Sequence, residues 1–108
     1  MHHDLLESMY GARRELTRII VGTGAQNVTA DVLQQLLQRR DRVTWTINRI
    51  LVSDLTSSLA QIDQACTAID AATTQLRKVT STEADIAQAL ALSAGVLAVA
   101  TQLLIAVA

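Results

Sequence analysis

Proline and phenylalanine are missing from this sequence, and cysteine, glycine and aromatic residues are scarce. There are one Cys, four Gly, one Trp and one Tyr among 108 residues. A single cysteine excludes a disulfide scaffold and a multi-cysteine zinc module. The shortage of aromatic and turn-forming residues argues against a β-rich fold, because strands favour aromatic side chains and their connections need Gly, Pro, Asn and Asp.

Charge is also sparse. Asp, Glu, Lys and Arg make up 18% of the chain, and the formal net charge is −1, whereas an average soluble domain has roughly 25% charged residues. This balance argues against a dedicated nucleic-acid-binding protein, which carries a basic surface. Half of the residues are apolar, so the chain is not a disordered tail. The length fits a single domain over residues 1–108.

No arrangement of residues typical of an enzyme is visible in the sequence. It has no Ser–His–Asp set, no phosphate-binding loop and no cluster of metal ligands. We therefore predict a non-enzymatic protein without a metal, a cofactor or a small-molecule substrate. The first residues lack the basic start and apolar run of a signal peptide, which predicts a cytoplasmic protein. The bias towards Arg and Ala indicates a GC-rich bacterial or phage genome.

Apolar spacing predicts an all-α fold with three helices. The first covers residues 4–21, where apolar residues recur at steps of three and four, and it ends at the glycines of residues 22–24. The second covers residues 30–79 and starts at a Thr29 cap. The third covers residues 82–108 and turns back on the second after a tight loop, as an antiparallel pair.

The long amphipathic central segment is the main feature of this prediction. Fifty helical residues extend over about 75 Å, and the second half repeats its apolar residues at steps of four and three, the spacing of a coiled coil. The apolar registers of the two halves do not join smoothly at residues 53–58, where Ser and Thr hydroxyls compete for backbone hydrogen bonds. A stutter in one helix and a break between two both fit, and the absence of Gly and Pro favours one helix.

The last segment is unusual because residues 86–108 include no charged side chain. A helix of this length measures about 35 Å and can cross a hydrocarbon core of about 30 Å. Two apolar seams flank a stripe of small residues that lets another helix approach closely. Enclosure by protein, in a soluble bundle or a subunit interface, and enclosure by lipid, which would make the protein membrane-associated, both remain open.

The heptad seam fits both an intramolecular helical hairpin and a coiled coil between chains, and the amount of apolar surface favours some association through coiled-coil-like surfaces, with other copies or with a helical partner. Two seams on one helix and one on another exceed what a lone chain of this size is expected to hide. The predicted interface residues are Leu55, Leu59, Ile62, Ile69 and Leu76 in the central segment, and Leu90, Ala91, Gly95, Leu97, Leu104 and Val107 in the last. Cys66 lies on the central seam and is expected to be a small, buried, reduced thiol.

Four arginines of the central segment form a predicted electrostatic rim around these seams: Arg39, Arg40, Arg42 and Arg49. A guanidinium favours two-pronged pairing with carboxylates, here those of a neighbouring subunit. Trp45 is the one large aromatic residue of the chain, and we expect it to be an anchor in the core or in an interface.

Three functions fit these features. We favour a structural or adaptor subunit of a bacterial or phage assembly, which works by self-assembly or by binding a partner. The alternative is a membrane-active protein in which residues 86–108 insert into a bilayer as a tail anchor or as part of a pore. The third is a small regulator that binds through its Arg-rich helix.

Overall fold

The computed structural model describes residues 3–23, 29–52, 59–79 and 83–105. These residues form four helices and include no strand. The helices are α1 (His3–Thr23), α2 (Ala30–Val52), α3 (Leu59–Arg77) and α4 (Glu83–Ile105). The predicted all-α class is confirmed, whereas the predicted number of three helices is wrong.

The central segment is two helices rather than one. α2 ends at Val52 and α3 begins at Leu59, so the favoured continuous helix over residues 30–79 is wrong. A helix of about 75 Å would exceed the longest dimension of the molecule, which is 44 Å. Each half of the segment has its own apolar face, and folding back buries both faces in one core instead of leaving them in water. Residues 53–58 themselves lie outside the described residues.

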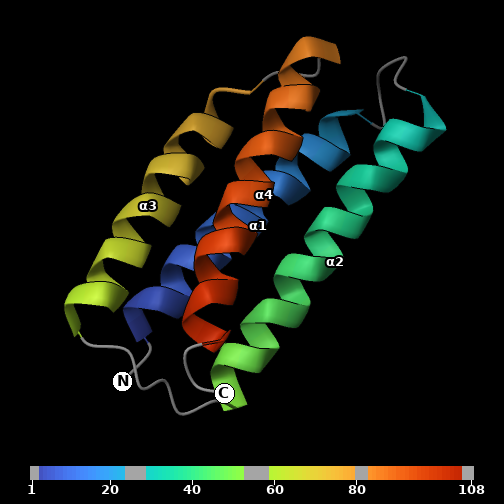
Figure 1. The fold of residues 1–108 in the computed structure, drawn as a ribbon. Helices are drawn as coiled ribbons and strands as arrows, with labels where there is room; N and C mark the ends of the chain where they lie inside the picture. Colours follow the sequence, from blue (N-terminus) through green and yellow to red (C-terminus); the bar gives the residue numbers. More distant parts are fainter. Residues whose placement is uncertain (1–2, 24–28, 53–58, 80–82, 106–108) are drawn as a thin grey trace.

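The helices form a bundle in which the chain direction alternates from one helix to the next (Figure 1). α1 packs against α2 and α3, and α4 packs against the same two helices. α2 and α3 occupy opposite corners and make no contact with each other over their described residues. The bundle therefore has four faces, and the face between α1 and α3 lies opposite the face between α2 and α4.

The core draws on the apolar faces that the spacing predicted. In α1 the buried apolar residues are Leu5, Met9, Ala12, Leu16 and Ile19, which recur at the predicted steps of four and three, together with Ile20. In α4 both seams contribute, through Ile86, Val96, Leu97, Ala100 and Leu103. Two sides of α4 face the bundle interior, where the helix packs against α2 and α3, and this packing accounts for the apolar residues of both seams.

The heptad seam of α3 faces inward as well. Ile62, Ile69, Thr73 and Leu76 are buried against the other helices of the same chain. The chain therefore covers most of this seam by itself, contrary to the expectation that a lone chain cannot hide it, whereas Leu59 at the start of the seam stays 77% exposed. Burial of the apolar surface of such seams stabilises the fold. Four short helices can bury them against one another, whereas one long helix and one returning helix would leave part of the long helix uncovered.

Local hydrogen bonds mark the helix ends. At the start of α2, Val32 N donates to Thr29 Oγ1 at 3.4 Å and Leu33 N donates to Thr29 O at 3.1 Å, which confirms the predicted cap. α1 continues through Gly22 to Thr23, slightly beyond its predicted end. The predicted antiparallel return of the last helix onto the preceding one is confirmed by the packing of α3 against α4 (Figure 1).

Candidate functional site

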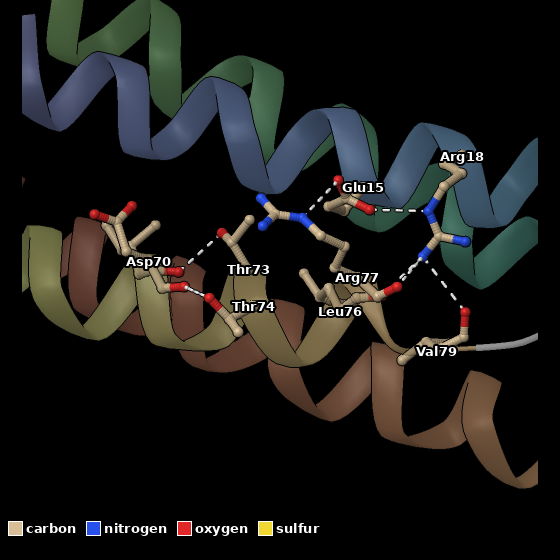
Figure 2. A network of polar contacts seen from close by, with 9 residues as sticks. Glu15, Arg18, Asp70, Thr73, Thr74, Leu76, Arg77 and Val79 are labelled. Carbon is tan, nitrogen blue, oxygen red and sulfur yellow. Dashed lines mark hydrogen bonds and ion pairs between the residues drawn. The ribbon is translucent and has the colours of Figure 1, made fainter.

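A polar cluster joins α1 to the end of α3 (Figure 2). The Arg18 guanidinium donates from Nε to Glu15 Oε1 at 2.8 Å and from Nη2 to Leu76 O at 2.9 Å. The same Nη2 lies 3.4 Å from the carbonyl oxygens of Arg77 and Val79. Arg77 Nε completes the cluster by pairing with Glu15 Oε2 at 3.6 Å. One guanidinium of α1 thus holds the last turn of α3.

This cluster is a helix cap supplied by another helix. The last carbonyls of an α-helix lack intrahelical donors, and the Arg18 guanidinium satisfies them while its charge meets the negative end of the helix dipole. The Glu15 side chain is buried, and its charge is compensated by two arginines. The cluster therefore fixes α3 against α1 and sets the shape of the groove between these two helices.

The predicted interface residues have very different surroundings in the folded chain. Those buried inside the bundle are Ile62, Ile69, Leu76 and Leu97. Those half-buried at its edge are Leu90 and Leu104. Those exposed to solvent are Leu59, Ala91 and Gly95. Leu55 and Val107 lie outside the described residues. Most of the large apolar side chains predicted to meet a partner therefore meet their own chain, and the small ones face outward.

One face of the bundle, between α3 and α4, carries a surface made of uncharged side chains. A hollow of about 360 Å³ lies there, and its lining residues are Gln61, Gln64, Ala65, Ala68, Val99, Gln102 and Leu103. α4 extends this surface with the exposed Ala91, Gly95 and Ala98. The charged side chains within α3 lie elsewhere, because Asp63, Asp70 and Arg77 line a groove against α1. We call the surface formed by the hollow and the exposed small residues of α4 the uncharged face.

Gly95 lies in the middle of the uncharged face. A Cβ atom added at this position would meet nothing within 4 Å, so packing inside the chain does not require a glycine. Glycine in a helix interior is less stable than alanine by about 0.5–1 kcal/mol. The predicted stripe of small residues thus faces away from the bundle, where it leaves room for an external helix to approach closely.

The face between α1 and α3 is acidic. It has a groove of about 500 Å³ lined by four carboxylates, those of Asp4, Glu7, Asp63 and Asp70. Small side chains and one cation complete the lining: Ser8, Gly11, Cys66, Thr67, Thr73 and Arg77. Within the described part of the chain, no cation forms an ion pair with Asp4, Asp63 or Asp70. We call this surface the acidic groove.

The pKa of the Cys66 thiol is affected by the carboxylates of the acidic groove. Burial raises the pKa of its thiol, and the negative charges of Asp70, Asp4 and Asp63 raise it further, against an opposing hydrogen bond from Ser8. The side chain is half-buried rather than fully buried as the seam predicted. A thiol with a raised pKa is mostly protonated near neutral pH, and it is a poor nucleophile in that form.

The solvent-exposed side of α2 carries arginines around the tryptophan, and two of these arginines also border α4. Arg42 Cζ lies 4.5 Å and Arg49 Cζ lies 5.8 Å from the centroid of the Trp45 ring, within the range of cation–π attraction. Trp45 is 49% exposed, so a core role is wrong. Arg39 and Arg42 also line a hollow of about 220 Å³ next to Leu97 of α4. We call Arg39, Arg42, Trp45 and Arg49 the basic stripe.

Arg40, the fourth predicted rim residue, is separate from this stripe. Its carbonyl accepts a hydrogen bond from Thr44 Oγ1 one turn later, and Thr44 in turn accepts from Arg13 of α1 at 3.4 Å. Arg40 therefore lies on the side of α2 that faces α1. Helical geometry separates it from Arg39 and Arg42, although the three are close in sequence.

Over the described ranges, no group of three or more His, Cys, Asp and Glu side chains is placed to hold a metal ion. In the same ranges one segment, Asp85–Leu104, is long and apolar enough to cross a bilayer, with a mean hydropathy of 1.7 and 39% of it buried in the bundle. The core helix of a soluble bundle meets the same criteria.

Comparisons with protein-family models, with curated proteins and with solved structures gave no match to this chain. The surfaces of the molecule therefore have to be interpreted from their own chemistry.

The acidic groove was not predicted from the sequence. Part of its signal is there, because Asp63, Asp70 and Arg77 recur every seven residues and so share one side of a helix. Asp4 and Glu7 join them only because α1 packs beside α3, and nothing in the local spacing of either segment indicates that pairing.

Proposed function

We propose that this protein is a non-enzymatic helical subunit that works by associating with other subunits, and first of all with copies of itself. The observation that carries this proposal is the uncharged face, with its hollow between α3 and α4 and its exposed small residues around Gly95. Small, exposed, uncharged side chains leave room for a helix of another protein to pack closely on this surface.

The chemistry of the uncharged face suits contact with the same face on a second copy. In a two-fold symmetric contact each surface meets itself, so any charge would meet a like charge. Glutamine avoids this conflict because its side-chain amide both donates and accepts hydrogen bonds. Gln64 and Gln102 lie on opposite sides of the hollow and can pair across the contact, while Ala91 and Gly95 allow the helices to come close.

Detergent-free size-exclusion chromatography with light scattering tests this proposal. We expect the wild-type protein to have a mass of at least twice the 11.6 kDa of a single chain. Ala91→Arg and Gln102→Arg place a charge on the uncharged face, and both should shift the mass towards that of a single chain with the helical circular dichroism unchanged. A wild-type protein that remains a single chain contradicts the proposal.

Gln34→Arg is the matched control. Gln34 is exposed on α2, away from α3 and α4, and Gln102→Arg makes the same change on the uncharged face. Gln34→Arg should keep the wild-type mass. If Gln34→Arg and Gln102→Arg reduce the mass equally, added charge rather than the uncharged face is responsible.

A second candidate function is membrane insertion through α4. The observation in its favour is the apolar Asp85–Leu104 segment, of which less than half is buried in the bundle. Insertion would require α4 to leave α2 and α3 and expose their buried residues, which bilayer contact would have to offset. Flotation with liposomes and release of an entrapped dye test it. A protein that stays in the soluble fraction and leaves the dye enclosed excludes this function.

A further inference from the structure

We infer that copies of this chain also join side by side through unlike faces, with the basic stripe of one copy docked into the acidic groove of the next. This inference rests on the proposed function in treating the protein as self-associating. It concerns different residues, however, and it specifies a contact that repeats from copy to copy.

The two surfaces are complementary in charge and lie on opposite faces of one bundle. The basic stripe lies on α2, where Arg39 and Arg42 also border α4, and the acidic groove lies between α1 and α3 on the other side of the bundle (Figure 1). Opposite charges on opposite faces cannot pair within one molecule. Between copies they give a head-to-tail contact, which continues into a filament or closes into a ring.

The charges also match in spacing. Arg42 and Arg49 are seven residues apart on α2, and Asp63 and Asp70 are seven residues apart on α3. Both separations correspond to about 10.5 Å along a helix axis. Two guanidinium groups can therefore meet two carboxylates in the same contact, and charge-assisted pairs between Arg and Asp are among the stronger polar contacts at an interface.

The charges match in height as well. α2 ends and α3 begins at the same end of the bundle (Figure 1). Arg49 comes three residues before the end of α2, and Asp63 comes four residues after the start of α3. A neighbour displaced sideways, without a shift along the bundle axis, therefore brings Arg49 to the level of Asp63. The same displacement brings Arg42 to the level of Asp70.

Trp45 and the floor of the groove fit the same arrangement. Trp45 lies seven residues before the end of α2 and Cys66 seven residues after the start of α3, so the indole reaches the level of Cys66. The groove is lined there by the small side chain of Ser8, and further along by Gly11 beside Thr73. A half-exposed tryptophan between two arginines is the kind of residue on which binding energy concentrates.

The field inside the groove supports the choice of a cationic occupant. Four carboxylates line this groove, and three of them, Asp70, Asp4 and Asp63, add to the effect of burial in raising the pKa of the Cys66 thiol. A neighbour that brings guanidinium groups compensates these charges, whereas an anionic or purely apolar occupant leaves them unpaired.

Sedimentation velocity at low ionic strength with complementary charge reversals tests the inference. The first variant combines Arg42→Glu with Arg49→Glu, and the second combines Asp63→Arg with Asp70→Arg. In each variant alone, two surfaces of the same charge meet at the contact, and we expect the dissociation constant of self-association to rise about tenfold or more. In an equimolar mixture, the acidic stripe of the first variant can meet the basic groove of the second, and the basic stripe of the second can meet the acidic groove of the first. Alternating copies should therefore recover the wild-type size distribution.

The outcomes separate this inference from the proposed function. If both variants keep the wild-type size, or if their mixture fails to recover it, the side-by-side contact is wrong. If, in addition, Ala91→Arg reduces that size, the proposed function stands without this contact. A wild-type protein that stays a single chain at every concentration contradicts both. Gln34→Glu, an exposed change on α2 outside the stripe, should leave the distribution unchanged.

Trp45 gives a second measurement on the unmodified protein. It is the only tryptophan in the chain, so its fluorescence reports this contact directly. We expect the emission to shift to shorter wavelength and quenching by acrylamide to fall as the protein assembles. Both changes should reverse in about 1 M salt, where the screening length falls to about 3 Å. An emission that does not depend on protein concentration contradicts the contact.

Discussion

At the scale of single residues, Arg18 has the greatest influence on the architecture. It supplies donors to the last turn of α3 and pairs with the buried Glu15 (Figure 2). The sequence places Arg18 only on the polar side of the first helix, since nothing local indicates that α3 ends beside it. The role of Arg18 follows from tertiary packing, and so does the shape of the groove that this packing creates.

Arg18→Ala should lower the free energy of unfolding by about 1–2 kcal/mol, because it removes the cap of α3 and one of the two cations beside a buried carboxylate. Urea unfolding followed by circular dichroism measures the change. Arg14→Ala, at an exposed position on the same helix, should change the stability by less than about 0.5 kcal/mol. Equal stability of the two variants would show that the cluster does not hold α3.

The thiol of Cys66 permits a test of the field in the acidic groove. Because the Asp70 charge helps to raise the pKa of this thiol, Asp70→Asn should lower that pKa and increase the thiolate fraction at any pH below it. The alkylation rate at pH 8 should therefore rise. Asp31→Asn, on the first turn of α2, should have no effect. An unchanged rate in Asp70→Asn would mean that the groove carboxylates do not act at its floor.

At the scale of helices, the sequence identifies most of the buried faces but not the elements that cover them. The spacing of Leu5, Met9 and Leu16 and the heptad seam through Ile62 and Ile69 both predict burial, and both sets are buried. A seam of this kind specifies only that something apolar must cover it. Whether another copy or the next helix of the same chain does so depends on where the chain folds back.

The fold-back between α2 and α3 is the point at which the sequence prediction failed. No Gly or Pro marks it, and the hydroxyl-rich residues 53–58 are compatible with either outcome. The deciding factor is global, because only a break lets the seams of α2, α3 and α4 share one core. The acidic groove has the same origin, because it combines carboxylates of α1 and α3 and so depends on which helices are neighbours, whereas the arginines of the basic stripe share one helix and could be predicted from the sequence.

Gly95 provides a prediction for α4 as an element. Gly95→Ala should raise the free energy of unfolding by about 0.5–1 kcal/mol, because alanine favours the helix and its Cβ meets nothing within 4 Å. Thermal unfolding at low protein concentration measures this change. The same variant should weaken association through the uncharged face, where the added methyl group keeps a neighbouring helix further away. A less stable variant would mean that the surroundings of Gly95 are closed.

At the scale of the whole molecule, the bundle buries its own seams and associates through what is left on its surface. A substitution at Leu97 distinguishes association through the outer surface from association through the apolar seams. Leu97 is buried within the chain, so Leu97→Asp should unfold the subunit, at a cost of several kcal/mol for an unpaired buried charge. Ala91→Asp, on the exposed side of the same helix, should stay folded and lose only the association through the uncharged face. A folded, monomeric Leu97→Asp variant would place the interface at the seam instead.

Sedimentation velocity of the wild-type protein over a series of concentrations, without detergent and with circular dichroism on each sample, tests the central claim most directly. The account predicts a helical subunit of 11.6 kDa at high dilution that assembles into larger species as the concentration rises. A mass that stays at 11.6 kDa throughout would contradict association, and a loss of helix on dilution would contradict a bundle that seals its own core.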